Sequence, residues 1–248
     1  MANAPDLRPL TARSVVLSTL LGSHPPRIGA RQAVRVGELF GIAEGTIRVA
    51  LSRMVAAGDL VQIPERGGAY ELTERLVQRQ ARQDESRFPR TRPWDGTWEI
   101  AVVTAERRRP AAERAALRQA MSALRLAELR EGTWLRPANL GRPRPEIVQR
   151  QCAFLSGRPE EEPAALAASL WDLDGWACTA RELRAALDAA GSLAEQFTVS
   201  AAVLRHLLRD PLLPAALLPA GWPGPELREH YERFEADFER LLTDHISA

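Results

Sequence analysis

The stretch "GELFGIAEGTIRVALSRMVAAGDL", residues 37–60, is followed directly by "VQIPERGGAYELT", residues 61–73. Apolar residues at helical spacing predict one short helix over 34–43 and another over 43–58, which ends at Gly58. The following residues alternate towards a Gly-Gly pair and predict a two-stranded hairpin. Upstream, "TARSVVLSTLLG" (11–22) predicts a helix that turns Val15, Leu17, Leu20 and Leu21 inward.

The two sides of the 43–58 helix differ in chemistry. At about 100° per residue, one side collects the apolar residues Ile47, Ala50, Leu51 and Met54. The other side carries small residues flanked by Arg48 and Arg53. The first side is expected to pack into a core, and the second can approach another surface closely.

Three helices and a hairpin within about 65 residues match a winged helix-turn-helix, in which the third helix enters the DNA major groove. Arginine suits phosphates and guanine edges, and hydroxyl groups can bond to either. Winged helices also bind proteins, so that alternative stays open. The residues expected to contact DNA are Thr46, Arg48, Val49, Ser52, Arg53 and, at the tip of the wing, Arg66.

The charge of the chain is unevenly distributed. The formal net charge is only +1, yet residues 1–92 hold 14 arginines against 9 acidic residues. Attraction to a polyanion acts over about 10 Å at ordinary salt concentrations, so a locally basic segment is sufficient. The charge distribution therefore permits DNA binding by the N-terminal part.

Composition favours a globular protein of the cytoplasm. Hydrophobic residues make up 45% and charged residues 26% of 248 residues. We expect no leader, because no charged and apolar segment begins the chain, and no run approaches the roughly 18 apolar residues of a membrane span. Cys152 and Cys178 form no CxxC pair, so we expect two reduced thiols, no metal site and no cofactor.

The remaining sequence predicts an α+β multidomain protein. "FPRTRPW" (88–94) indicates a boundary, "WEIAVVT" (98–104) a strand, and residues 111–129 a helix; "GTWLRPANL" (132–140) and "IVQRQCAFLSG" (147–157) indicate further strands. From about residue 163 the pattern is helical. We expect a DNA-binding domain with linker over 1–92, a small α+β domain over 93–160, and an all-helical domain over 161–248.

Two features of the helical part allow specific predictions. "TAREL" (179–183) resembles a capping box, which predicts a helix that begins after Thr179. The stripe Leu227, Tyr231, Phe234, Phe238 and Leu241 is expected to form core, with a dimer seam as the alternative.

Catalytic motifs are missing from the sequence. It holds no GxSxG, HExxH or P-loop pattern. A metal-dependent nuclease needs carboxylates at the end of its first strand, whereas 98–104 ends in Thr104 and Asp95 precedes it. The acidic run Glu160 to Glu162 is expected to be a solvated loop. The sequence therefore argues against an enzyme.

Three segments carry a specific resemblance. "FTVSAAVLRHLLRDPLLPAALLPAGWPGPELR" (197–228), "LWDLDGW" (170–176) and "GTWLRPANL" (132–140) resemble landmarks of the PaaX family of bacterial repressors. The resemblance implies a winged helix, a ferredoxin-like dimerisation domain and a helical C-terminal domain. It also implies a homodimer that binds an inverted-repeat operator of a catabolic operon and is released by phenylacetyl-CoA. The recognition-helix arginines of the family correspond to Arg48 and Arg53.

An acyl-CoA effector would need phosphate ligands and an apolar pocket. Arginines can bind CoA phosphates, and tryptophans can cover an aromatic acyl group. The alternatives are that the arginines are solvated, the tryptophans are core, and the prolines after Arg209 are a rigid scaffold. A regulator that senses another acyl-CoA, or no small molecule, is the second hypothesis. The residues expected to bind the effector are Trp134, Arg136, Asn139, Arg205, His206, Arg209 and Trp222.

Overall fold

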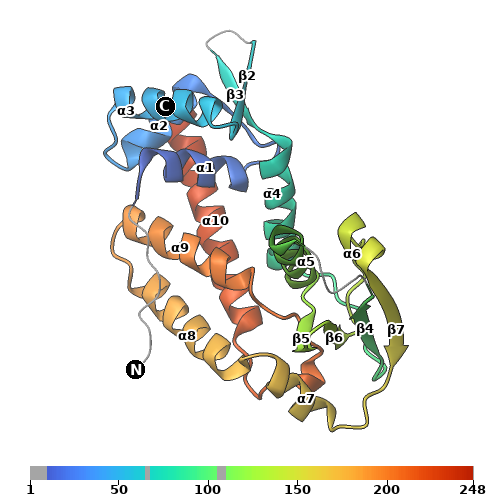
Figure 1. The fold of residues 1–248 in the computed structure, drawn as a ribbon. Coiled ribbons are helices and arrows are strands. Elements are labelled where there is room, and N and C mark those ends of the chain that lie inside the picture. Colours follow the sequence, from blue (N-terminus) through green and yellow to red (C-terminus); the bar gives the residue numbers. More distant parts are fainter. Residues whose placement is uncertain (1–9, 65–67, 105–109, 248) are drawn as a thin grey trace. The chain divides into compact units, whose positions relative to one another are not determined.

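The computed structural model describes residues 10–64, 68–104 and 110–247, in which helices combine with two small antiparallel sheets (Figure 1). The chain forms two compact units. Unit 1 comprises residues 1–88, 177–210 and 223–248, and unit 2 comprises residues 89–176 and 211–222. Each unit is therefore assembled from segments that lie far apart in the sequence, and the predicted division at 92 and 160 stays a prediction.

The first part of unit 1 contains the elements expected around residues 37–73. Helices α1 (Ala12–Gly22), α2 (Ala30–Leu39) and α3 (Glu44–Ala56) are followed by strands β2 (Leu60–Ile63) and β3 (Ala69–Leu72). The helix and hairpin predictions are confirmed, although α2 lies about four residues earlier than predicted. Strand β1 (Arg27–Gly29), which was not predicted, pairs with β3 and gives the sheet order β1-β3-β2.

The buried residues of these helices follow the predicted spacing. Val15, Leu17, Leu20 and Leu21 of α1 are buried, as are Ile47, Ala50, Leu51 and Met54 of α3. The polar segment after the hairpin forms helix α4 (Glu74–Arg87). The apolar side of α3 therefore faces the core, as expected.

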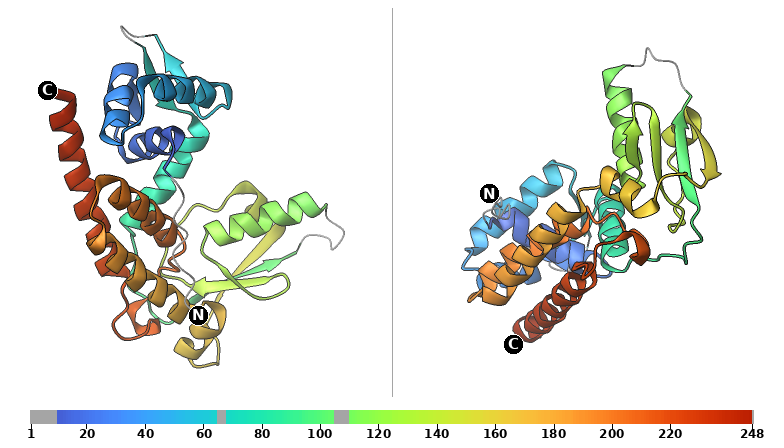
Figure 2. Two further views of the ribbon diagram at one scale, coloured as in Figure 1. Left: turned by 90° about the vertical axis from the view of Figure 1, so that its left-hand side faces the viewer. Right: turned by 90° about the horizontal axis from the view of Figure 1, so that it is seen from below.

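The core of unit 1 also includes distant helices. Helix α9 (Leu193–Leu207) supplies Phe197, and the long helix α10 (Gly224–Ser247) supplies Phe234 and Phe238 to the cluster that contains Ile47 and Leu51. Helix α10 packs against both α9 and α2 (Figure 2). The stripe on α10 is thus core from Leu227 to Phe238, and only Leu241 is exposed. This settles the alternative of a dimer seam in favour of core packing.

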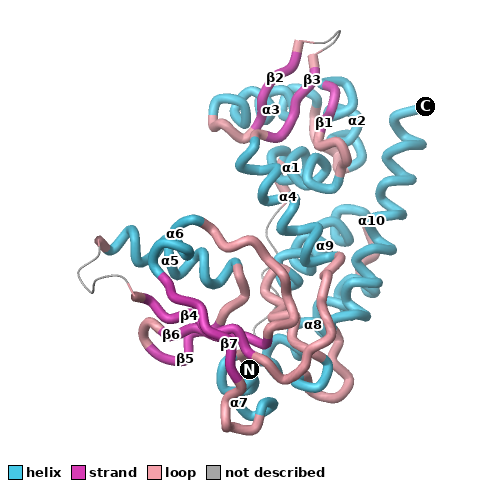
Figure 3. The backbone as a smooth tube through the Cα atoms, turned by 90° about the vertical axis from the view of Figure 1, so that its right-hand side faces the viewer, coloured by secondary structure: helices cyan, strands magenta, loops and turns pink. Residues whose placement is uncertain are grey.

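Unit 2 is built around the second sheet, whose strands are drawn in magenta and labelled β4 to β7 in Figure 3. Its elements are β4 (Trp98–Val103), α5 (Ala111–Ala123), β5 (Ala127–Arg130), β6 (Thr133–Pro137), α6 (Glu146–Gln151) and β7 (Cys152–Gly157). The sheet order is β5-β6-β4-β7, and all pairs are antiparallel.

The sequence predicted only four of these six elements. The expected helix over 111–129 stops at Ala123, because Arg125 adopts a positive φ of 60° and the chain turns into β5. The expected strand over 147–157 begins with helix α6, and only residues from Cys152 onward are extended. In both cases a pattern of apolar residues spans a change of secondary structure.

Side-chain alternation lets the second sheet bury both faces. Trp98 and Leu135 point to one cluster, which also holds Leu166 and Leu213. Ala101 and Trp134 point to the opposite cluster, together with Met121 of α5 and Val148 of α6. Trp134 is therefore a core residue beneath α5 and α6.

The described residues after 163 form helices and loops. Helices α7 (Pro163–Leu170), α8 (Leu173–Ala189) and η1 (Ala215–Leu217) complete the fold. Glu162 begins α7 by accepting hydrogen bonds from the backbone N–H groups of Ala164 and Ala165, at 3.1 and 2.7 Å. The prediction of a helix start at Thr179 was wrong, because Thr179 lies inside the continuous helix α8. None of the described helices is both long and apolar enough to span a membrane.

Candidate nucleic-acid interface

Helix α3 is fixed in place by its junction with α2. Gly41 has φ +66° and allows the sharp turn that ends α2. Gly37 lies directly against Ile47 of α3, where a Cβ atom would come within 2.6 Å of Ile47 Cγ1. The two helices can therefore approach closely only because position 37 has no side chain.

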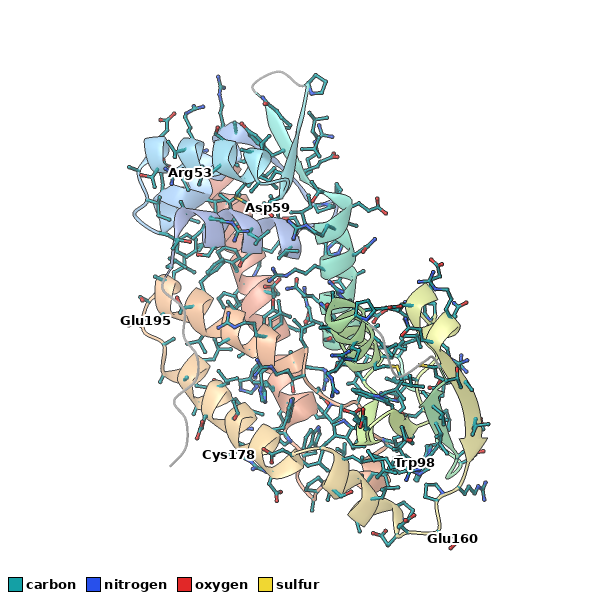
Figure 4. All side chains as sticks on the ribbon, viewed as in Figure 1. Arg53, Asp59, Trp98, Glu160, Cys178 and Glu195 are labelled. Atoms are coloured by element: carbon teal, nitrogen blue, oxygen red, sulfur yellow. The ribbon has the colours of Figure 1, made fainter. Side chains whose placement is uncertain are left out.

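The outward side of α3 is exposed along its length. Thr46, Arg48, Val49, Ser52 and Arg53 are all exposed, and Val49 keeps 49% of its surface accessible. Figure 4 marks Arg53 on this helix. The structure therefore brings together five of the six residues predicted to contact DNA. The sixth, Arg66, lies outside the described residues.

The two arginines on this face differ in their partners. Arg48 forms an ion pair with Glu44 one turn earlier, with Nη2 2.7 Å from the carboxylate. Arg53 forms no ion pair with any described residue. An unpaired guanidinium can bind a phosphate or a guanine edge without first losing a carboxylate partner. Arg53 is thus the better prepared of the two to bind an anion.

Asp59 joins three helices and was not predicted to have a role. It follows the positive-φ residue Gly58 at the end of α3, and its carboxylate is buried. Arg13 of α1 donates to it at 2.7 Å, and Arg75 of α4 donates at 2.6 Å. Burial opposes the ionisation of Asp59, but the hydrogen bonds and charges of the two arginines lower its pKa overall. The Asp59 clamp therefore fixes the end of α3 relative to α1 and α4.

Four of the seven residues predicted to bind an effector lie in unit 2: Trp134, Arg136, Asn139 and Trp222. Trp134 is buried in the core, with the Arg118 guanidinium 5.5 Å from its ring centre. Arg136 is only 1% exposed and donates to the backbone carbonyls of Arg125 and Pro137 and to Asn139 Oδ1. Burial lowers the pKa of the Arg136 guanidinium, and the nearby charges of Arg125 and Arg142 add to the effect. These contacts give Arg136 a structural role.

The segments that resemble family landmarks contact one another. Leu212, which has φ +52°, offers its carbonyl to Arg136 Nη2 at 3.3 Å and to Asn139 Nδ2 at 2.9 Å. Trp222 stacks on Trp176, with ring centres 4.5 Å apart. The segments 132–140, 170–176 and 211–222 therefore share contacts within unit 2, and the contacts explain their residue types without a ligand.

The other three predicted effector residues lie in unit 1, at the end of α9. Arg205 is half-buried, His206 is buried, and Arg209 is exposed. Just beyond them, the buried Asp210 accepts a hydrogen bond from Arg228 of α10 at 2.5 Å. The seven predicted residues are thus divided between the two units, and their shared role in binding an effector stays a prediction.

Asp95, Thr104 and the two cysteines have ordinary structural surroundings. Asp95 accepts a hydrogen bond from the backbone N–H of Thr97 at 2.9 Å, which accounts for it as a turn residue. Thr104 bonds to the carbonyl of Gln151. Cys152 is buried and Cys178 exposed, and both are free thiols. Within 10–64, 68–104 and 110–247, no group of three or more His, Cys, Asp or Glu side chains is arranged to hold a metal ion.

Family models match three successive parts of the chain. Residues 11–76 match the PaaX-like protein, residues 91–152 the PaaX protein central Cas2-like domain, and residues 173–248 the PaaX-like protein C-terminal domain. The chain belongs to the PaaX family. This confirms the resemblance seen in the sequence, and membership of the PaaX family indicates a PaaX-like regulator.

One solved structure is similar over nearly the whole chain. It is described as an uncharacterized protein, Rv0674, from Mycobacterium tuberculosis. The two chains are 46% identical, with coverage of 96% of this chain and 99% of the other, and the TM-score is 0.82. Among the curated proteins, none matches the chain.

Proposed function

We propose that this PaaX-family chain is a DNA-binding transcriptional regulator whose residues 12–72 form a winged helix-turn-helix. Helices α2 and α3, joined by the tight turn at Gly41, correspond to the helix-turn-helix, and the β2–β3 hairpin corresponds to the wing. The observation that carries the proposal is the exposed side of α3, on which Arg53 has no carboxylate partner among the described residues.

The proposed contacts follow from side-chain chemistry. Arg53 would bind a guanine edge or a phosphate, Arg48 a phosphate after release from Glu44, and Thr46 and Ser52 base edges or phosphate oxygens. Val49 lies between them and would contact a thymine methyl group. Arg66, in the wing, is proposed to bind the phosphate backbone of the DNA.

We also propose how the protein assembles and how an effector controls its binding to DNA. We assign unit 2 a ferredoxin-like core, because its strands and helices follow the order β-α-β-β-α-β. A homodimer would bind an inverted repeat as a repressor of a catabolic operon, and phenylacetyl-CoA is the proposed effector. The two winged helices of the dimer would have one arrangement that binds DNA and another that does not. The effector needs only to bind the second arrangement more tightly than the first, by a few kcal/mol. The second proposal is a regulator of the same build that senses another acyl-CoA or no small molecule.

The exposed side of α3 can be tested with a matched pair of variants. Val49 on α3 and Leu129 on β5 keep 49% and 50% of their surface exposed, so Val49→Glu and Leu129→Glu introduce the same charge at equal exposure. We expect Val49→Glu to weaken binding to DNA from the chain's own upstream region more than about tenfold, because a carboxylate would face phosphates. Leu129→Glu should bind normally in the same gel-shift titration. Equal affinity of both variants for DNA would show that α3 does not contact DNA.

A further inference from the structure

Unit 2 contains a small cavity beside the buried Arg136, with a volume of about 180 Å³. The side chains of Arg136, Arg142 and Arg144 line it, and among the described residues that line it Glu99 is the only acidic one. Pockets for organic ligands typically measure about 300 to 1,000 Å³. The size of this cavity therefore suits a small ion or a single charged group rather than a whole organic molecule.

Arg136 brings a charge without a carboxylate partner into this region. Its guanidinium is almost fully buried, and within the described part of the chain its hydrogen bonds go to backbone carbonyls and to Asn139 Oδ1. Buried charges in proteins are usually paired with an opposite charge. Burial lowers the pKa of Arg136 to about 9, and the charges of Arg125 and Arg142 add to this effect. A nearby anion would therefore stabilise the charged form of Arg136.

The nearest acid is already bound to another arginine. Glu99 of β4 lies opposite Arg136 of β6 in the sheet register, so both side chains are on the same face of the sheet. The Glu99 carboxylate, however, accepts hydrogen bonds from Arg144, through Nε at 3.2 Å and Nη2 at 2.7 Å. Three arginines and one glutamate thus line the cavity, which gives these side chains a net charge of +2.

Arg92 adds a further guanidinium at the edge of the cavity. Its backbone N–H donates to the carbonyl of Asn139 at 2.8 Å, which brings it beside the cavity residue Gly141. A Cβ atom at position 141 would collide with Arg92 Nη2 and would lie 2.8 Å from its Cζ. Arg92 is exposed, and its side chain forms no hydrogen bond or ion pair with any described residue. It can therefore bind an anion without losing a partner.

We propose that this cavity binds a tetrahedral oxyanion of the phosphate type, held by Arg92 and Arg142 close to the buried charge of Arg136. Arginine binds such oxyanions through two parallel N–H groups. Arg142 is fixed beside the cavity by its hydrogen bond from Nη1 to the carbonyl of Ala123, at 2.9 Å. The anion is either free phosphate or the phosphate group of a larger molecule. Its binding requires neither DNA nor an effector, so the proposal goes beyond the proposed function.

Calorimetric titration of the full chain tests the site, with inorganic phosphate and glycerol 3-phosphate as probes at constant, low ionic strength. We expect saturable binding with one anion per chain. Arg92→Gln should weaken it about fivefold or more, because a charged ligand of the anion is lost. Glu99→Gln should tighten it about three- to tenfold, because the carboxylate that repels the anion is removed and Arg144 is released. Arg130→Gln, an exposed change on β5, should leave the affinity unaltered.

These variants separate anion binding from folding. Arg92→Gln removes no contact with a described residue, so its melting temperature without phosphate should match that of the unaltered chain. Tighter binding by Glu99→Gln cannot result from unfolding. Tighter binding of inorganic phosphate than of the ester would assign the site to the free ion, and the reverse order to a phosphate group.

Absence of saturable binding for both probes would overturn the proposal. So would an affinity that stays the same in Arg92→Gln and in Glu99→Gln, because the anion would then bind elsewhere on the chain. All of these measurements are made without DNA. The proposed regulator function is judged separately, by the gel-shift titration of Val49→Glu.

Discussion

Gly37 of α2 packs so closely on Ile47 of α3 that a Cβ atom at position 37 would fall 2.6 Å from Cγ1 and 2.7 Å from Cδ1 of Ile47. The two atoms belong to a fully buried side chain, which has little space to move. The angle between the two helices therefore depends on the missing side chain.

The first prediction is that Gly37→Ala destabilises the protein by about 1 to 3 kcal/mol, as expected for overpacking a core contact. Urea unfolding followed by circular dichroism measures the loss. Gly45→Ala is the matched control, because a Cβ atom there meets nothing within 4 Å and alanine is the better helix former. Because Ile47→Ala removes both Cγ1 and Cδ1, Gly37→Ala should cost much less in an Ile47→Ala background than in the unaltered chain. Equal stabilities for the two alanine variants would contradict the close contact.

The second prediction concerns how the free energy of unfolding depends on pH, and it rests on Asp59. Because its pKa is lowered in the folded state, Asp59 stabilises the protein above its ordinary pKa of 3.8, and this contribution disappears as the pH falls through the folded-state value. Asp59→Asn should therefore cost about 1 to 3 kcal/mol at neutral pH. The difference between the variant and the unaltered chain should narrow towards acidic pH.

A surface pair provides the control for Asp59. Asp237 pairs with Arg240 within α10, and both side chains are mostly exposed. Asp237→Asn should change the free energy of unfolding by less than about 0.5 kcal/mol at any pH. A gap between Asp59→Asn and the unaltered chain that stays constant from neutral to acidic pH would show that ionisation of Asp59 does not contribute.

Local patterns predicted the elements around α3 correctly. The buried residues of α3 recur at helical spacing, and the Gly-Gly pair in the sequence predicted a hairpin, so these elements could be recognised within their own residues. Strand β1 could not, since its three residues are extended only through pairing with β3, about forty residues later. The predicted DNA-contacting side of α3 followed from the same local periodicity.

Long-range packing explains what the sequence did not reveal. Phe197, Phe234 and Phe238 show helical spacing, but nothing local indicates that they complete the core beneath α1 and α3. Arg136 was predicted to bind an effector phosphate because it is an arginine. In the structure it donates a hydrogen bond to the carbonyl of Leu212, 76 residues away, and this contact could not be predicted from the local sequence.

The third prediction separates the two arginines of α3. Arg53→Ala should weaken operator binding and reduce the slope of log K against log salt concentration by about one if Arg53 binds a phosphate. If it binds guanine instead, the loss should be about 1 to 3 kcal/mol at one base position. Arg48→Ala should have the smaller effect, because Arg48 must first leave Glu44. Arg130→Ala on β5 removes another exposed arginine, and the affinity of this variant for the operator should be unchanged.

The last prediction concerns Asn139, whose effector role and structural role lead to different results. Its Nδ2 donates to the carbonyl of Leu212 at 2.9 Å, and its Oδ1 accepts from Arg136 at 2.8 Å, both in buried surroundings. Asn139→Ala removes two buried hydrogen bonds, so we expect a loss of about 1 to 3 kcal/mol in the free energy of unfolding. Arg130→Ala should change it by less than about 0.5 kcal/mol. The affinity of the folded variant for phenylacetyl-CoA, measured by calorimetry well below its melting temperature, should match that of the unaltered chain. A variant of normal stability that has lost this affinity would instead place Asn139 in an effector site and would refute its assignment as a link between two segments of unit 2.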